Sequence, residues 1–214
     1  MIAVIDYGAG NLRSIRRALE AARAETVVTA DPETVTAADA VVLPGVGAAR
    51  HAMDRLRDLG MTGAITDAVE GGKPFLGICL GMQLLFEGQE EGDTAGLGLL
   101  RGRIRSLSGP VKVPHIGWNR SRIVRPGPLG RVGDERHYYF VHSYVAEPMD
   151  HDDVAAVADY GERFPSVVVR DNVWGTQFHP EKSGPDGLEL VRAFVASARP
   201  AHGTPAVAPI GAAS

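Results

Sequence analysis

The only cysteine of the chain, Cys79, lies between two glycines, Gly77 and Gly81, directly after a short apolar run. That run, residues 74–78, predicts a buried strand, and the pattern over residues 82–86 predicts a helix. A sharp turn between a strand and a helix requires small residues on both sides, because larger side chains would clash with the neighbouring elements. The sequence therefore predicts a turn that presents a thiol at the carboxyl end of a sheet. We also expect a helix N-terminus there, whose dipole favours the thiolate.

A second pattern, near the carboxyl end of the chain, supplies a base for this thiol. His179 and Glu181 are separated by Pro180, and side chains two positions apart in an extended segment lie on the same side. Glu181 can then hold one imidazole nitrogen while the other faces the thiol. Cys79, His179 and Glu181 are thus candidates for nucleophile, base and orienting carboxylate. The alternative is a buried, unreactive thiol, because free cysteine is among the most buried residue types.

Apolar runs alternate with helical patterns in the first part of the chain and predict an α/β fold, a mostly parallel sheet with helices on both faces. Strands are expected at residues 1–5, 25–29, 40–43 and 74–78, and helical stripes at residues 12–22, 49–56, 65–69 and 82–86. Gly8 and Gly10 follow the first strand, but Arg13 stands where a dinucleotide-binding loop would carry its third glycine. We therefore interpret residues 8–10 as a plain turn.

The second half of the chain has a different character. Residues 87–98 are acidic and glycine-rich and are expected to form a surface loop. Short β-rich runs separated by Gly and Pro then predict antiparallel strands and hairpins, at residues 104–107, 121–124, 137–146, 154–158, 166–170 and 173–178. A last helix is expected over residues 186–198. We predict one domain over residues 1–198 and a disordered tail over residues 199–214, which has little to bury.

The composition narrows the classes of function. The 214 residues are 44% hydrophobic and 22% charged, with a net charge of −4, which gives no basis for nucleic-acid binding. One cysteine cannot form an internal disulfide, and no signal peptide or membrane-spanning run is evident, so we expect a cytoplasmic protein without a membrane partner. The histidines lack metal-ligand spacing, so we expect neither a metal nor a cofactor.

Several stretches carry a family resemblance. Residues 77–83, Gly-Ile-Cys-Leu-Gly-Met-Gln, and residues 177–181, Gln-Phe-His-Pro-Glu, resemble the class I (triad) glutamine amidotransferases. Four further stretches resemble more narrowly the glutaminase subunits of imidazole glycerol phosphate synthase, in histidine biosynthesis: residues 5–12, 43–47, 114–119 and 139–144. The resemblance covers residues 1–198. It implies a class I glutamine amidotransferase-like (flavodoxin-like) sheet with antiparallel strands in the C-terminal half.

The resemblance also implies a reaction. The Cys79 thiolate would attack the side-chain amide of L-glutamine, and His179 would protonate the leaving ammonia. Water would then clear the glutamyl thioester to give glutamate. Oxyanion donors would be the backbone N–H groups of Leu80 and Gly47, although the Gly47 stretch by itself resembles an ordinary tight turn. The residues implied to hold the amino-acid end of glutamine are Gln83, Ser143 and Tyr144. For Gln83, a local hydrogen bond is an equal alternative.

A partner is implied as well, a (β/α)8-barrel cyclase subunit that forms a heterodimer with this chain. It would receive the ammonia and make imidazole glycerol phosphate and aminoimidazole carboxamide ribotide. Motif positions implied at that interface are Trp118, Asn119 and Lys182, and simple core packing is the alternative for Trp118. Two rival readings are another triad amidotransferase or γ-glutamyl hydrolase, and a non-catalytic binding subunit on the same fold. Residues 44–47 and 114–119 disfavour the first, and the intact triad disfavours the second.

Overall fold

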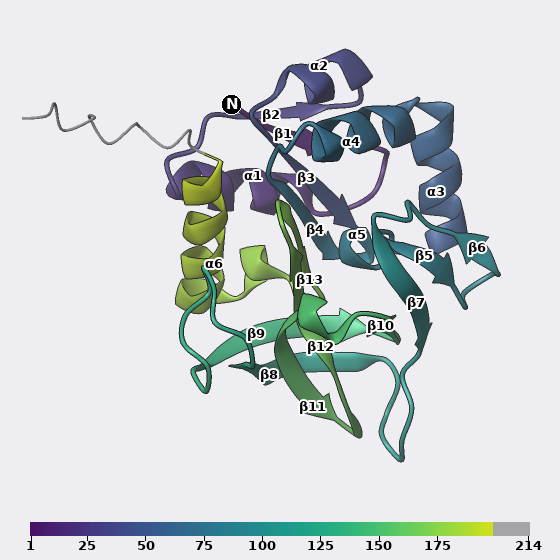
Figure 1. The fold of residues 1–214 in the computed structure, drawn as a ribbon, viewed down its shortest axis with the longest axis vertical. Helices are drawn as coiled ribbons and strands as arrows, with labels where there is room; N and C mark the ends of the chain where they lie inside the picture. Colours follow the sequence, from purple (N-terminus) through teal and green to yellow (C-terminus); the bar gives the residue numbers. More distant parts are fainter. Residues whose placement is uncertain (199–214) are drawn as a thin grey trace, which may run out of the picture.

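In the computed structural model, which describes residues 1–198, a nine-stranded sheet forms the centre of the molecule (Figure 1). Its first five strands are parallel to one another, and the remaining strands pair antiparallel. The order across the sheet is β2 (Thr26–Thr29), β1 (Ile2–Ile5), β3 (Ala40–Gly45), β4 (Phe75–Cys79), β13 (Val173–Thr176), β12 (Glu162–Arg170), β11 (Val154–Tyr160), β8 (His115–Ile123) and β9 (Glu135–His142). The expected mostly parallel sheet with antiparallel strands from the C-terminal half is confirmed.

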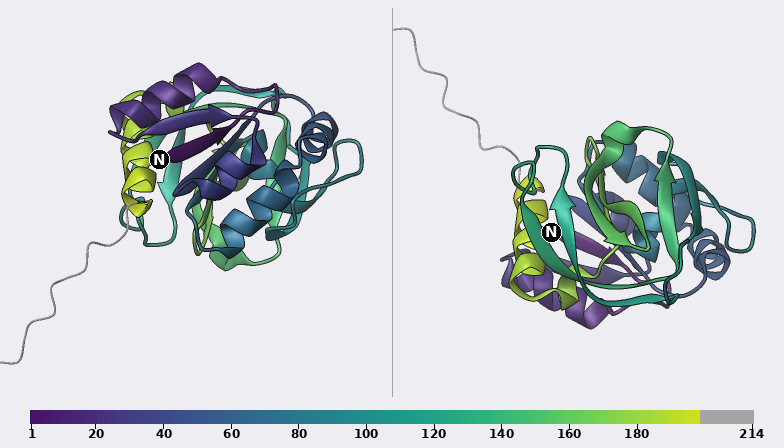
Figure 2. Two further views of the ribbon diagram at one scale, coloured as in Figure 1. Left: turned by 90° about the horizontal axis from the view of Figure 1, so that it is seen from above. Right: turned by 90° about the horizontal axis from the view of Figure 1, so that it is seen from below.

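Helices cover both faces of the parallel strands, as Figure 2 shows from above. One face carries α1 (Leu12–Ala21) and α6 (Gly184–Ser197), and the other carries α2 (Pro32–Ala37), α3 (Ala49–Asp58) and α4 (Met61–Glu70). The position of strand β1 between these two layers of helices explains why all its residues are apolar. Ile2 and Val4 belong to the core under α1 and α6, whereas Ala3 and Ile5 belong to the core under the other helices, since successive side chains of a strand point to opposite faces.

Helix α2 was missed in the sequence analysis, although its start carries a recognisable signal. The side chain of Asp31 accepts from the backbone N–H groups of Glu33 and Thr34, and Pro32 occupies the first turn. An acidic N-cap followed by proline satisfies N–H groups that have no helical partner and presets the backbone angle. The helix is only six residues long, so it has too few apolar positions for a periodic pattern.

A second, four-stranded sheet follows the cysteine turn and corrects three predictions. Its order is β10 (Tyr144–Pro148), β7 (Leu100–Ser106), β5 (Phe86–Gln89) and β6 (Thr94–Ala95). The helix predicted for residues 82–86 is wrong in extent, because α5 spans Leu80–Gln83 and Phe86 already pairs with β7. The predicted surface loop 87–98 contains β5 and β6. The run 137–146 is two strands, which separate at Ser143 and enter different sheets.

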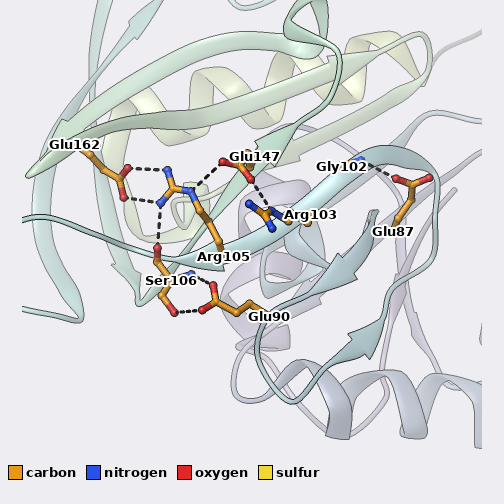
Figure 3. A network of polar contacts seen from close by, with 8 residues as sticks. All are labelled: Glu87, Glu90, Gly102, Arg103, Arg105, Ser106, Glu147 and Glu162. Carbon is orange, nitrogen blue, oxygen red and sulfur yellow. Dashed lines mark hydrogen bonds and ion pairs between the residues drawn. The ribbon is translucent and has the colours of Figure 1, made fainter.

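Arg105 on β7 ties the two sheets together through a network of ion pairs (Figure 3). Its guanidinium donates to both carboxylate oxygens of Glu162 on β12, at 2.8 and 2.7 Å, and its Nε lies 3.4 Å from Glu147 on β10. The hydrogen bond from Arg105 lowers the pKa of Glu162 to about 2. Planar bidentate pairing of this kind fixes geometry as well as charge. The network therefore sets how the second sheet sits beside the first.

The helices and the C-terminal part of the chain bear on three of the predictions. None of the helices within residues 1–198 combines the length and apolar character that a membrane crossing requires. The last helix, α6, begins two residues earlier than predicted and buries Leu190, Val191 and Phe194 against the sheet. The predicted tail, residues 199–214, lies outside the described residues.

Candidate active site

Cys79 occupies a strained turn between β4 and α5. Its backbone angles are φ 54° and ψ −110°, a conformation that residues other than glycine adopt at a cost. The flanking glycines make the turn possible. A Cβ on Gly81 would lie 1.9 Å from the carbonyl oxygen of Leu43, and one on Gly77 would lie 2.6 Å from that of Gly81. The strand-to-helix turn predicted from the sequence is confirmed, and close backbone packing is the reason for its two glycines.

The surroundings of the Cys79 sulfur differ from the expectation in one respect. The helix that follows is only four residues long, so its dipole is smaller than that of the predicted helix. The sulfur has polar contacts instead. The sulfur lies 3.7 Å from the carbonyl oxygen of Val141, to which its S–H donates. The side-chain amide nitrogen of Gln177 lies 3.8 Å from the sulfur.

The sheet brings the predicted base, His179, and the predicted orienting carboxylate, Glu181, to the edge at which Cys79 lies. Strand β13 is parallel to β4, with Thr176 beside Ile78, so residues 177–181 continue beyond the sheet next to the cysteine turn. Nδ1 of His179 lies 2.8 Å from a carboxylate oxygen of Glu181, and the two side chains are 3% and 1% exposed. The contact is as predicted, but the predicted reason is incomplete, because Glu181 lies in a 3₁₀ turn (Pro180–Lys182) rather than in an extended segment.

The electrostatics of His179 suit a proton carrier. Burial disfavours the imidazolium, but the negative charge of Cys79 and the hydrogen bond and negative charge of Glu181 outweigh it and raise the pKa to about 9. With Nδ1 engaged by Glu181, the other nitrogen, Nε2, is buried and has no hydrogen-bond partner among residues 1–198. This arrangement holds the imidazole by one nitrogen and leaves the second for the thiol proton.

A cavity of about 320 Å³ opens beside the sulfur, a size suited to a small ligand. Its walls come from the ends of β3 and β4, from the segment around β6 and from the junction of β9 and β10. The lining residues are Val46, Gly47, Cys79, Leu80, Gln83, Glu91, Pro114, Val141, His142, Ser143 and Tyr144. All residues implied as oxyanion donors or as glutamine-binding residues thus meet at one cavity.

The two residues whose backbone N–H groups are predicted as oxyanion donors, Leu80 and Gly47, both line the cavity. Leu80 is the first residue of α5, so its N–H has no acceptor within the helix. Gly47 has φ +92°, and nothing lies within 4 Å of the position a Cβ would take. A positive φ in open space is a backbone state that glycine adopts without strain. The Gly47 stretch is therefore a conformationally free turn at the cavity wall.

Gln83 is satisfied within the protein, as the local alternative in the sequence analysis expected. Its amide nitrogen donates to the carbonyl oxygen of Tyr144 at 3.2 Å and to the side-chain oxygen of Gln177 at 3.1 Å. Ser143 and Tyr144 line the same cavity as Cys79, at the junction of β9 and β10. The role of these three residues in holding glutamine stays a prediction.

Sequence reasoning missed three polar residues around the site. Glu91 lies in the segment predicted as a surface loop, yet it lines the cavity and accepts from the N–H of Ala49. Gln177 precedes His179 by two positions. Side chains with this spacing in an extended segment lie on the same side, and this was the signal that could have identified Gln177. His142, which precedes Tyr144 by two positions, is 5% exposed, lines the cavity and pairs with His115 at 3.0 Å.

The three implied interface residues lie outside the cavity. Trp118 is 59% exposed, so core packing is wrong for it, and its ring meets the edge of Tyr139. The ammonium nitrogen of Lys182 lies over the same Tyr139 ring, 5.8 Å from its centroid. The amide of Asn119 is directed inward, where it donates to the carbonyl of Asp159 at 3.0 Å. Within residues 1–198, no group of three or more His, Cys, Asp or Glu side chains could hold a metal ion.

Comparison with known proteins agrees with this geometry. The family model "Glutamine amidotransferase class-I" matches residues 3–198. The chain is 51% identical to "Imidazole glycerol phosphate synthase subunit HisH" of Geobacillus kaustophilus (strain HTA426) over 202 residues, 91% of this chain and 96% of the relative. It is 50% identical over 205 residues to the protein of the same name from Halobacterium salinarum, covering 91% and 92%.

Solved structures support the fold. A structure titled "Crystal structure of glutamine amidotransferase" superposes with a TM-score of 0.75 at 20% identity, over 92% of this chain and 99% of that one. The structure of PurLQS from Thermotoga maritima gives a TM-score of 0.69 at 20% identity, over 92% and 98%. The chain therefore belongs to the class I glutamine amidotransferase family and, within it, to the glutaminase subunits of imidazole glycerol phosphate synthase.

Proposed function

We propose that Cys79, His179 and Glu181 hydrolyse L-glutamine to glutamate and ammonia. The single observation that carries the proposal is the buried His179–Glu181 contact of 2.8 Å beside a cysteine in a strained turn. The thiolate attacks the amide carbon, and the Nε2–H of the His179 imidazolium gives its proton to the leaving ammonia. His179 then takes a proton from the water that cleaves the thioester. Glu181 holds the ring in the required tautomer throughout.

The cavity supports the remaining parts of this chemistry. The N–H groups of Leu80 and Gly47 stabilise the oxyanion, which forms within the cavity next to the sulfur. Gln83, Ser143 and Tyr144 belong to the wall of the same cavity and hold the amino-acid end of glutamine there. Glu91 adds a carboxylate to that wall, and a carboxylate is a suitable partner for the α-ammonium group of the substrate.

The ammonia passes to a (β/α)8-barrel cyclase subunit, with which this chain forms a heterodimer in the cytoplasm. The partner uses it to make imidazole glycerol phosphate and aminoimidazole carboxamide ribotide. Ile116 and Trp118 alternate on β8 and are 58% and 59% exposed, directly after the cavity residue Pro114. Exposed large apolar residues beside a cavity mouth favour a docking surface. Trp118 and Lys182, with Tyr139 between them, form its centre, and Asn119 supports it from behind.

The proposal is tested by mixing the chain with L-glutamine and the cyclase subunit and measuring glutamate. We expect the complex to release glutamate in two assays, one without and one with the nucleotide substrate of the cyclase. Imidazole glycerol phosphate should form in step with glutamate. A complex that forms but releases no glutamate would contradict the proposal.

Replacement of Glu181 by glutamine tests the orienting role. The variant keeps the size of the side chain but removes the charge that holds the Nδ1–H tautomer, so we expect turnover to fall by about 10²–10⁴. The KM for glutamine should stay near the wild-type value, because Glu181 is not among the cavity-lining residues. Steady-state kinetics of the complex measure both quantities. Wild-type turnover in a folded Glu181→Gln variant would exclude the role.

A further inference from the structure

The polar side chains of the cavity wall meet at one backbone oxygen, the carbonyl of Tyr144. It accepts from Nε2 of Gln83 at 3.2 Å and from Nδ1 of His142 at 2.9 Å. A carbonyl oxygen has no proton to give, so both side chains must donate to it. This one acceptor therefore fixes the amide orientation of Gln83 and the tautomer of neutral His142.

On one side of Tyr144, the hydrogen bonds lead to the nucleophile. Gln83 presents its NH₂ group, so Gln177 must present its oxygen, at 3.1 Å. The NH₂ group of Gln177 then faces the sulfur of Cys79, at 3.8 Å. Gln177 is 0% exposed, so water does not compete for this amide. A donor in such a place stabilises a thiolate more than a thiol, because charge on the acceptor strengthens a hydrogen bond.

On the other side, the hydrogen bonds lead toward β8. Nε2 of His142 is left as an acceptor, so Nδ1 of His115 donates to it, at 3.0 Å. Nε2 of His115 accepts in turn from the amide of Asn119, at 3.4 Å. Protonation of either ring would set two N–H groups against each other. Burial lowers the pKa of both histidines to about 4, so both rings are neutral near pH 7, as the pattern requires.

We propose that Gln177 is a further catalytic residue, whose amide N–H stabilises the Cys79 thiolate. His142 and His115 are positioning residues, which act through the Tyr144 carbonyl to keep that amide in its orientation. The role in turnover rests on the function proposed above, whereas the effect on the thiolate is measured without substrate or partner.

Two other titratable groups interact with Cys79 and have to be kept constant in a test. One is the imidazole of His179, whose far nitrogen is held by Glu181. The other is the buried phenol of Tyr7, whose pKa is raised by burial and then by the negative charge of Cys79. None of the variants below alters these groups.

The test uses the fact that Cys79 is the only thiol of the chain. The rate of alkylation by iodoacetamide, followed against pH with the full chain, therefore reports on this thiolate alone. Gln177→Glu keeps the oxygen that accepts from Gln83 and replaces the donor with a carboxylate oxygen. We expect the midpoint of the curve to move up by about one pH unit, so that the rate falls about tenfold at pH values below the wild-type midpoint. Gln177→Met, which has neither group, should give a smaller shift in the same direction.

The positioning residues are tested with a matched pair of variants. His115→Phe keeps a ring between Phe140 and Tyr160, on which His115 stacks at centroid distances of 5.0 and 4.0 Å, but cannot donate to His142. We expect its alkylation rate at pH 7 to fall severalfold. Tyr160→Phe keeps the same stack and loses only a hydrogen bond to the carbonyl of Lys112, so it should match the wild type. In the complex, Gln177→Met should lower kcat and leave the KM for glutamine unchanged.

The outcomes separate this inference from the proposed function. An unchanged alkylation curve in folded Gln177→Glu and Gln177→Met would overturn the role of Gln177. A shift in those two variants with a wild-type curve in His115→Phe would overturn the role of the histidines. If the curves shift as expected but the wild-type complex releases no glutamate, the proposed function fails and the thiolate donor stands. Melting curves of each variant establish that it is folded, and if Gln177→Glu does not fold, Gln177→Met decides.

Discussion

Replacement of Cys79 by alanine is expected to abolish glutamine hydrolysis in the complex, with turnover lower by at least about 10⁴-fold. No other thiol exists in the chain, so no neighbour can take over the attack on the amide. Synthesis of imidazole glycerol phosphate from added ammonium salts should persist, because that reaction belongs to the partner. Glutamate release and product formation, measured in parallel with each nitrogen source, check both parts.

Cys79→Ser is the matched control for this loss. Serine keeps a polar side chain of similar size in the strained turn, and its hydroxyl is a far weaker nucleophile than a thiolate at neutral pH. We expect hydrolysis to be lost again and ammonia-dependent synthesis to be kept. If either variant released glutamate at the wild-type rate, Cys79 would not be the nucleophile. If both lost ammonia-dependent synthesis as well, the change would lie in assembly of the complex.

Replacement of Gly47 by proline is expected to have the second largest effect. Proline has no N–H and fixes φ near −65°, whereas Gly47 has φ +92°. The variant therefore loses the N–H that we propose as an oxyanion donor, together with the present shape of the turn. Loss of one such donor typically lowers turnover by about 10²–10³, roughly 3–4 kcal/mol in the barrier. We expect glutamine hydrolysis to fall by at least this factor while ammonia-dependent synthesis in the complex is kept.

Gly47→Ala separates the donor from the flexibility of the turn. It keeps the N–H, and its Cβ would meet nothing within 4 Å, so only the positive φ is penalised. If the Val46–Gly47 peptide rotates to supply its N–H when the partner binds its ligand, this variant should respond to that ligand differently from the wild type. Stimulation equal to the wild type in folded Gly47→Pro and Gly47→Ala would mean that Gly47 is neither donor nor switch.

Local sequence patterns identified the parts of the site that depend on local geometry. The turn at Cys79 follows from its flanking glycines. The contact of His179 with Glu181 was predicted from their spacing, although a 3₁₀ turn (Pro180–Lys182) and not an extended segment brings the two side chains together. Their meeting with Cys79 depends on β13 inserting beside β4, which joins strands about one hundred residues apart in the chain. No local pattern contains that pairing, so the sequence analysis inferred the meeting of these residues from their chemistry alone.

Apart from the short helix α2, the wrong predictions of secondary structure have a common physical cause: tertiary pairing overrides local preference. Phe86 continues a helical pattern, but pairing with Leu100 on β7 draws it into a strand. The acidic residues after it were read as loop, yet Glu90 is held by the backbone and hydroxyl of Ser106. The hydrogen bonds that lead from Tyr144 to Cys79 and to Asn119 were equally invisible, because they join side chains from α5, β8, β9 and the segment after β13.

Covalent labelling with a chloroketone analogue of glutamine is the most direct test of the account. The account predicts that glutaminase activity of the complex is lost in proportion to the incorporation of one label, that peptide mapping places this label on Cys79, and that glutamine slows the reaction. Complete inactivation with Cys79 unmodified, or full glutaminase activity with Cys79 fully labelled, would contradict it.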